Sequence, residues 1–148
     1  MAGMEQRISF ITLAVGDLAA SRAFYLDGLG WHAELDVPGE VLMIKAGRHL
    51  VLSLWDQRAF EEEVGPISRG HGAPPLTLAH NVVAPEEVDR ILGRARELGA
   101  DPVSEPVRRE WGGYSGYFAD PDGYRWEIAV NPGSIGQMVL PGRMTADD

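Results

Sequence analysis

The feature that most constrains the fold of this chain is an order of elements that occurs twice. Each half of the sequence predicts a strand, a helix and three further strands, in the order β-α-β-β-β. Val15 before the first predicted helix matches Val82 before the second, and Leu29-Gly30 matches Leu98-Gly99 at the helix ends. One helix covers only one face of a sheet, so the other face of each half must curl around a cavity, a ligand or the other half.

Apolar periodicity and the residues that begin or end helices locate the expected elements. Asp17 is suited to cap the first helix, and Pro85 is suited to the first turn of the helix that Gly99 ends. Gly47-Arg48 predicts a tight hairpin between two strands, and an acidic stretch after Asp56 predicts a short helix. The expected strands are residues 8–15, 41–46, 49–55, 76–83, 102–107, 113–119 and 124–130.

A tight turn at Asp120-Pro121-Asp122-Gly123 precedes the last predicted strand. Proline presets φ at the second position, the aspartates bond the local backbone, and the glycine takes a positive φ. Side chains alternate along the strand that follows, so Glu127 lies on the face opposite Trp126 and Ile128. A carboxylate on such a face can bind a metal ion if other ligands converge on it.

Composition excludes several classes of function. The 148 residues include no cysteine, which excludes disulfides, thiolate metal sites and a cysteine nucleophile. Because 13 basic residues face 22 acidic ones, for a net charge of −9, we expect no nucleic-acid partner. We find no apolar run long enough to span a membrane and no secretion signal at the N-terminus. We therefore expect a soluble cytoplasmic protein without a membrane partner.

The sequence resembles the vicinal oxygen chelate superfamily, which includes glyoxalase I, extradiol dioxygenases and bleomycin-binding resistance proteins. The opening of its module is similar to residues 11–18, 24–25 and 29–31, and its close is similar to residues 117–123 and 126–128. The resemblance implies an α+β fold of two βαβββ modules, each a curled mixed sheet with a helix on its outer face, that form a U-shaped cavity. It implies a domain over residues 1–135, with modules at 8–64 and 76–132, and a C-terminal tail at 136–148.

Enzymes of that superfamily usually hold one divalent metal ion through His, Gln or Glu side chains on the first and last strands of each module. The matching positions here are Phe10, Val51, Thr77 and Glu127, with Val51 placed by aligning the glycines that precede each last strand. Phenylalanine and valine have no donor atom, and a neutral threonine is a poor primary ligand. One carboxylate alone does not hold zinc or iron specifically, so we expect no metal site and no cofactor.

Aromatic residues among glycines suggest a different use of the same cavity. Trp111 and Tyr117 share strand parity, and Trp55 points to the cavity face of its own strand. Such a cradle suits a planar or amphipathic small molecule, whereas the alternative is that the rings simply fill the space. The expected ligand-binding residues are Phe10, Ser53, Trp55, Thr77, Trp111, Tyr114, Tyr117 and Glu127.

The leading prediction is a protein that binds a small, partly aromatic molecule without the usual metal centre, for example to sequester a drug. The alternative is a lyase, isomerase or dioxygenase relative that uses Glu127 as a general base or holds a metal in an atypical site, with His49 as a candidate partner. A third possibility is a regulatory or structural module with a filled cavity. The expected partners are a small molecule and a second copy of the chain, in a homodimer.

Overall fold

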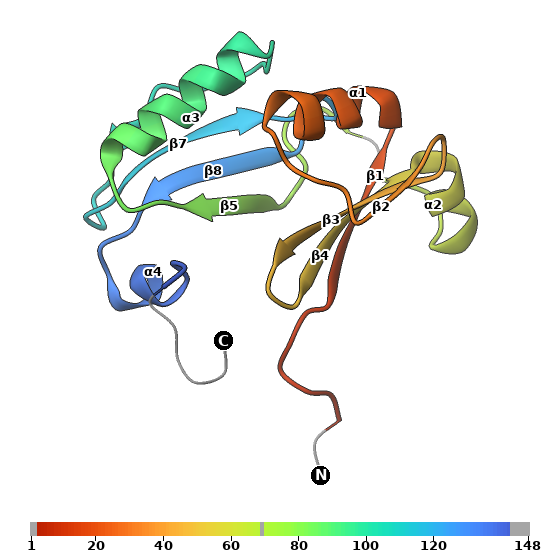
Figure 1. Cartoon of the computed structure of the whole chain (residues 1–148), viewed down its shortest axis with the longest axis horizontal. Coiled ribbons are helices and arrows are strands. Elements are labelled where there is room, and N and C mark those ends of the chain that lie inside the picture. Colours follow the sequence, from red (N-terminus) through yellow and green to blue (C-terminus); the bar gives the residue numbers. More distant parts are fainter. Residues whose placement is uncertain (1–2, 69, 143–148) are drawn as a thin grey trace. The chain divides into compact units, whose positions relative to one another are not determined.

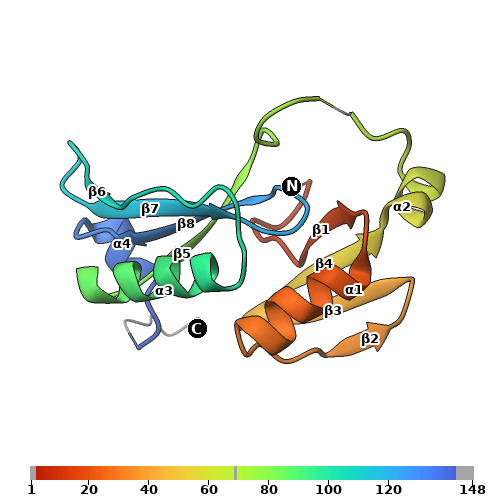
Figure 2. The ribbon, with the colours of Figure 1, turned by 90° about the horizontal axis from the view of Figure 1, so that it is seen from above.

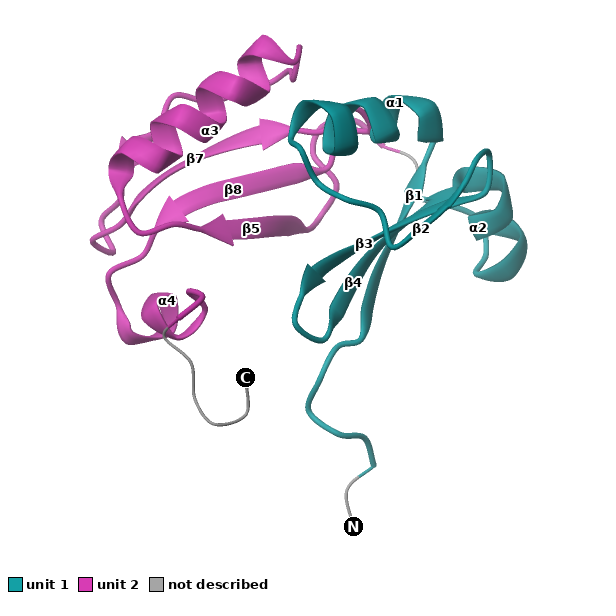
Figure 3. Cartoon of the chain, viewed as in Figure 1, with its two compact units in different colours: residues 1–69 teal, residues 70–148 magenta. Residues whose placement is uncertain are grey.

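Two repeated sheets form the framework of the protein. The computed structural model describes residues 3–68 and 70–142, and the chain divides into two compact units, residues 1–69 and 70–148 (Figure 3). Each unit holds a four-stranded mixed sheet, with the orders β1-β4-β3-β2 and β5-β8-β7-β6. In each unit the first and last strands pair in parallel and the other neighbours pair antiparallel. The predicted α+β fold with two modules is therefore confirmed.

The first unit contains a helical segment that follows β1. Asp17 caps it as predicted, since its carboxylate accepts from the backbone N–H groups of Ala19 and Ala20. The segment packs on the face of the sheet that carries Leu52 and Leu54, and both leucines are buried (Figure 2). The elements are β1 (Phe10–Val15), α1 (Leu18–Arg22), the π-helical turn η1 (Ala23–Gly28), β2 (Leu35–Val37), β3 (Val41–Gly47), β4 (Leu50–Asp56) and α2 (Gln57–Glu63).

Two details of the first unit differ from the sequence prediction. The hairpin turns at Arg48-His49 rather than at Gly47-Arg48, because the register between β3 and β4 shifts between Lys45 and Gly47. The short strand β2 supplies the third strand that the predicted β-α-β-β-β order requires after the helix, but its residue range was not predicted, since three residues are too few to show a period. An ion pair between Arg22 of α1 and Asp36 of β2 ties this strand to the helix.

In the second unit, α3 lies along one face of the sheet (Figure 1). Pro85 occupies its first turn, and Gly99 follows its end with a φ of 86°, as predicted. Its buried side chains Val88, Leu92 and Ala95 face strands β7 and β8. The elements are β5 (Thr77–Asn81), α3 (Pro85–Glu97), β6 (Val107–Arg108), β7 (Tyr114–Ala119), β8 (Arg125–Val130) and α4 (Ser134–Met138).

The short helix α4 was not predicted from the sequence. A Cβ atom at Gly136 would lie 2.3 Å from the carbonyl oxygen of Asn131, so glycine permits this close approach of the helix to the chain before it. Leu140 is buried beyond the helix. The predicted tail at 136–148 therefore begins inside an ordered helix, and its residues 143–148 lie outside the described residues. Within the described part of the chain, no helix has the length and apolar character needed to cross a membrane.

The turn before β8 has the predicted geometry. One oxygen of the Asp120 carboxylate accepts from the backbone N–H groups of Asp122 and Tyr124, each at 2.9 Å. Gly123 takes a φ of 87°, and its N–H donates to the Asp120 carbonyl oxygen at 3.0 Å. The turn fixes where β8 begins and therefore which face of the sheet carries Glu127.

Candidate functional site

The face of the second sheet opposite α3 collects polar and aromatic side chains. Strand alternation places Thr77, Ala79, Ser115, Tyr117 and Glu127 on this face, which we call the Glu127 face. Glu127 stands directly opposite Tyr117 on β7 and beside Ala79 on β5. Two of the predicted residues are thus brought into direct contact.

The contact between Tyr117 and Glu127 is a hydrogen bond. The Tyr117 hydroxyl donates to Glu127 Oε2 at 3.0 Å. Burial raises the pKa of the Tyr117 phenol, the bond to Glu127 raises the same pKa further, and the charge of Arg109 opposes both effects. Tyr117 is therefore protonated at neutral pH, and it supplies the proton of this hydrogen bond.

Arg109 also belongs to the Glu127 face, although the sequence did not indicate it. Its Nε donates to the Ser115 hydroxyl at 2.8 Å, and its Nη2 donates to the Ser115 carbonyl oxygen at 3.3 Å. Its guanidinium carbon lies 6.0 Å from the centroid of the Tyr117 ring. Arg109 precedes β7 in an irregular segment, where strand parity cannot place a side chain, so no sequence signal identified it.

Trp111 packs against the start of β7. A Cβ atom at Gly113 would lie 1.8 Å from an atom of the Trp111 ring, so the indole occupies the place where a side chain at position 113 would stand. Side chains alternate along β7, so position 113 is on the same face as Ser115 and Tyr117, and the Trp111 ring lies on that face. With 53% of its surface exposed, Trp111 remains accessible to a ligand.

Alanine substitutions at two glycines are expected to shift stability in opposite directions. Gly113→Ala should destabilise the fold by at most about 1 kcal/mol, because the new methyl group displaces the Trp111 ring, which is exposed enough to shift. Gly93→Ala should stabilise it by about 0.5–1 kcal/mol, because beyond the helix backbone and the two chain neighbours no atom of the described residues lies within 4 Å of the added methyl. Urea unfolding measures both. Equal effects of the two substitutions would contradict the assigned position of Trp111.

Tyr114 does not join this group. It lies on the α3 side of the sheet, where its hydroxyl donates to Asp89 of α3 at 2.6 Å and Arg108 stands over its ring at 5.3 Å. Thr77 is on the Glu127 face and is exposed, but its register partner on β8 is Arg125 rather than Glu127. The structure therefore places Trp111, Tyr117, Glu127 and Thr77 on one face, where Tyr117 and Glu127 are in contact and the Trp111 ring stands at position 113, four residues before Tyr117 on β7.

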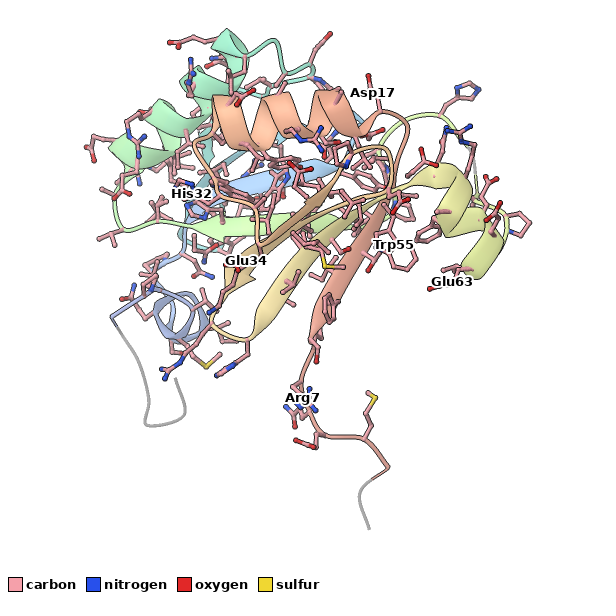
Figure 4. The ribbon with its side chains drawn as sticks, turned by 45° about the vertical axis from the view of Figure 1, so that its right-hand side comes forward. Arg7, Asp17, His32, Glu34, Trp55 and Glu63 are labelled. Carbon is pink, nitrogen blue, oxygen red and sulfur yellow. The ribbon has the colours of Figure 1, made fainter. Side chains whose placement is uncertain are left out.

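The remaining predicted residues lie on the first unit. Phe10, Ser53 and Trp55 share the face of the first sheet opposite α1, which we call the Ser53 face. Phe10 is 54% exposed. Trp55 lies where β4 leads into α2 (Figure 4). Its ring packs edge-on against that of Phe60, with the centroids 6.3 Å apart.

Ser53 stands out because its side chain is buried without a hydrogen bond. Only 1% of Ser53 is exposed, and its Oγ has no partner among the described residues. A buried hydroxyl that is left unpaired costs about 1–3 kcal/mol. Such a group on a sheet face is a candidate contact for a ligand.

The strand registers change one detail of the predicted site. Phe10 pairs with Val51 in the first module, and its equivalent Thr77 pairs with Arg125 in the second. Val51 is therefore equivalent to Arg125, and Ser53, two residues further on, is equivalent to Glu127. The alignment on glycines is wrong because the first hairpin turns at Arg48-His49. The turn also leaves His49 exposed and outside β4, so strand parity does not direct it to the Ser53 face.

The donor atoms present do not fit the divalent metal that the resemblance implies. Among residues 3–68 and 70–142, no three His, Asp or Glu side chains gather closely enough to hold a metal ion. At the four ligand positions, in the corrected register, the side chains are Phe10, Ser53, Thr77 and Glu127. Phenylalanine has no donor atom, and two neutral hydroxyls with one carboxylate make a weak set for zinc or iron.

Comparisons with known proteins agree with this fold. The family model of the glyoxalase/bleomycin resistance protein/dioxygenase superfamily matches residues 7–128. A glyoxalase-related enzyme from Fulvimarina pelagi is 36% identical, with 86% of this chain and 90% of that chain covered and a TM-score of 0.77. A lactoylglutathione lyase from Agrobacterium tumefaciens is 30% identical, with 85% and 94% covered and a TM-score of 0.64. No curated protein matches. The chain belongs to the glyoxalase/bleomycin resistance protein/dioxygenase superfamily.

Proposed function

We propose that this chain binds a small, partly aromatic, positively charged molecule without a divalent metal. The observation that carries the proposal is the neighbourhood of Glu127. Its carboxylate accepts a hydrogen bond from Tyr117 at 3.0 Å, and the described residues offer no pair of further His, Asp or Glu side chains to complete a metal site. A carboxylate beside aromatic rings is suited to an organic cation instead.

The other groups on the Glu127 face support the same class of ligand. Tyr117 and the half-exposed Trp111 offer ring faces for stacking, which contributes about 0.5–1.5 kcal/mol per ring pair beyond the burial of area. The net charge of −9 attracts cations to the protein at low ionic strength. On the first unit, Ser53 offers an unpaired hydroxyl, and Phe10 and Trp55 offer further aromatic surface.

Binding of this kind, without chemical change, would allow the protein to sequester a drug. The second candidate is an enzyme of the lyase, isomerase or dioxygenase type in which Glu127 is a general base. Its support is the 30% identity to a lactoylglutathione lyase, together with a carboxylate on a sheet face.

We further propose that the chain acts as a homodimer, which sedimentation at micromolar concentration distinguishes from a monomer.

The proposed function is tested by titration with planar cationic compounds, bleomycin-like ones included. Quenching of tryptophan fluorescence in the wild type should identify a ligand, and calorimetry should show a loss of affinity of about tenfold in Trp111→Ala, since a stacked ring is worth about 1 kcal/mol or more. Trp31→Phe is the control, because Trp31 packs on the buried Tyr25. Absence of binding, or equal affinity in Trp111→Ala and wild type, would favour a filled cavity.

A further inference from the structure

We propose that Arg109 makes the Glu127 face selective for aromatic molecules that carry an anionic group as well as a cationic one. This inference rests on the proposed function and adds the charge pattern of the ligand. The two charged groups meet different parts of a single side chain: the Arg109 guanidinium stands over the Tyr117 ring with its carbon 6.0 Å from the ring centroid, and the Tyr117 hydroxyl lies 3.0 Å from Glu127 Oε2. A molecule that packs against Tyr117 beside this guanidinium therefore meets a positive and a negative side chain.

Arg109 is held in place by neutral groups. Its hydrogen bonds go to the hydroxyl and the carbonyl oxygen of Ser115, a residue with 0% exposure. These bonds engage Nε and Nη2 and leave the Nη1 donors for another acceptor. Within the described part of the chain, no carboxylate lies at ion-pair distance from Arg109. A half-buried guanidinium that is fixed but has no ion-pair partner is suited to an external anion.

The charges of the two side chains define which ligands are favoured. An anion without a cation is repelled by Glu127 and by the net charge of −9. A cation without an anion satisfies Glu127 but leaves the Arg109 donors unused. An aromatic zwitterion, with its ring on Tyr117, its cationic group toward Glu127 and its carboxylate toward Arg109, satisfies both. A guanidinium and a carboxylate form parallel hydrogen bonds, which also fixes the orientation of the ligand.

Three probes that share one phenyl ring separate these contributions. We expect phenylalanine, which carries both charges, to bind about tenfold more tightly than 2-phenylethylamine, which is only cationic, and 3-phenylpropionate, which is only anionic, to bind least. Arg109→Gln should reduce the affinity for phenylalanine to that for 2-phenylethylamine and leave the latter unchanged. Arg109→Lys should retain part of the preference. Arg108→Gln is the matched control, because Arg108 stands over Tyr114 on the α3 side.

The outcomes distinguish this inference from the function on which it rests. Binding of 2-phenylethylamine with no gain from the carboxylate of phenylalanine, measured by ligand-observed NMR on the wild type, overturns the role of Arg109 and leaves the proposed function standing. An equal loss of affinity for both probes in Arg109→Gln also overturns it, since that result indicates a structural role. Failure of all three probes to bind would contradict both proposals.

Discussion

Replacing Asp120 with alanine is expected to lower the free energy of unfolding by about 3 kcal/mol. Asp120 is only 5% exposed, and one oxygen of its carboxylate accepts from two backbone N–H groups, those of Asp122 and Tyr124. Removing the carboxylate leaves the N–H groups of Asp122 and Tyr124 without this acceptor, and burial of the turn at Asp120 limits the access of water to them. Hydrogen bonds to a charged group are each worth about 1.5–3 kcal/mol, and two that share one oxygen are not fully additive.

A matched control exists at the other end of the chain. The Asp17 carboxylate also accepts from two backbone N–H groups, those of Ala19 and Ala20, but it is exposed to solvent. Asp17→Ala should therefore cost about 1 kcal/mol, the usual value for a lost helix cap. Urea unfolding of both variants measures the difference. A loss at Asp120 no larger than the loss at Asp17 would show that the turn does not depend on its buried carboxylate.

Replacing Glu127 with glutamine is expected to reduce the affinity for a cationic aromatic ligand at least tenfold, which corresponds to about 1.4 kcal/mol. Glutamine keeps the size of the side chain and an oxygen that accepts from the Tyr117 hydroxyl, so the variant removes charge with little change in packing. Calorimetry with 2-phenylethylamine measures the change. Glu110→Gln removes an exposed charge and should leave the affinity unchanged. Equal affinities in wild type and Glu127→Gln would exclude Glu127 as the cation contact.

Local sequence signals predicted most elements of this fold because they act over a few residues, but the strand expected at 102–107 was wrong, since β6 is only Val107–Arg108. Asp17, Pro85 and Gly99 occupy the helix positions that their chemistry favours. Strand parity placed Tyr117 and Glu127 on one face, and the register confirms that they stand opposite each other. The face on which a side chain lies can be predicted along a regular strand because successive side chains point to opposite faces.

The same signals failed where the chain is irregular. Arg109 reaches the Glu127 face from a segment between strands, so its direction depends on contacts with Ser115 that no periodicity encodes. Tyr114 was assigned to the ligand by composition, but alternation from Tyr117 puts it on the α3 side. The residue equivalent to Glu127 is Ser53 rather than the predicted Val51. The two modules were aligned on their glycines, but the position of each hairpin, which the glycines do not fix, decides which residues of the two last strands are equivalent.

The measurement that tests the account most directly is the metal content of the purified protein. Elemental analysis of wild type and Glu127→Gln, after incubation with zinc, nickel, iron or manganese and extensive dialysis, should find well under one metal ion per chain in both. The reason is that Phe10, Ser53 and Thr77 leave Glu127 as the one carboxylate among the matching positions. One tightly held ion per wild-type chain that disappears in Glu127→Gln would contradict the account and would favour a metal-dependent enzyme.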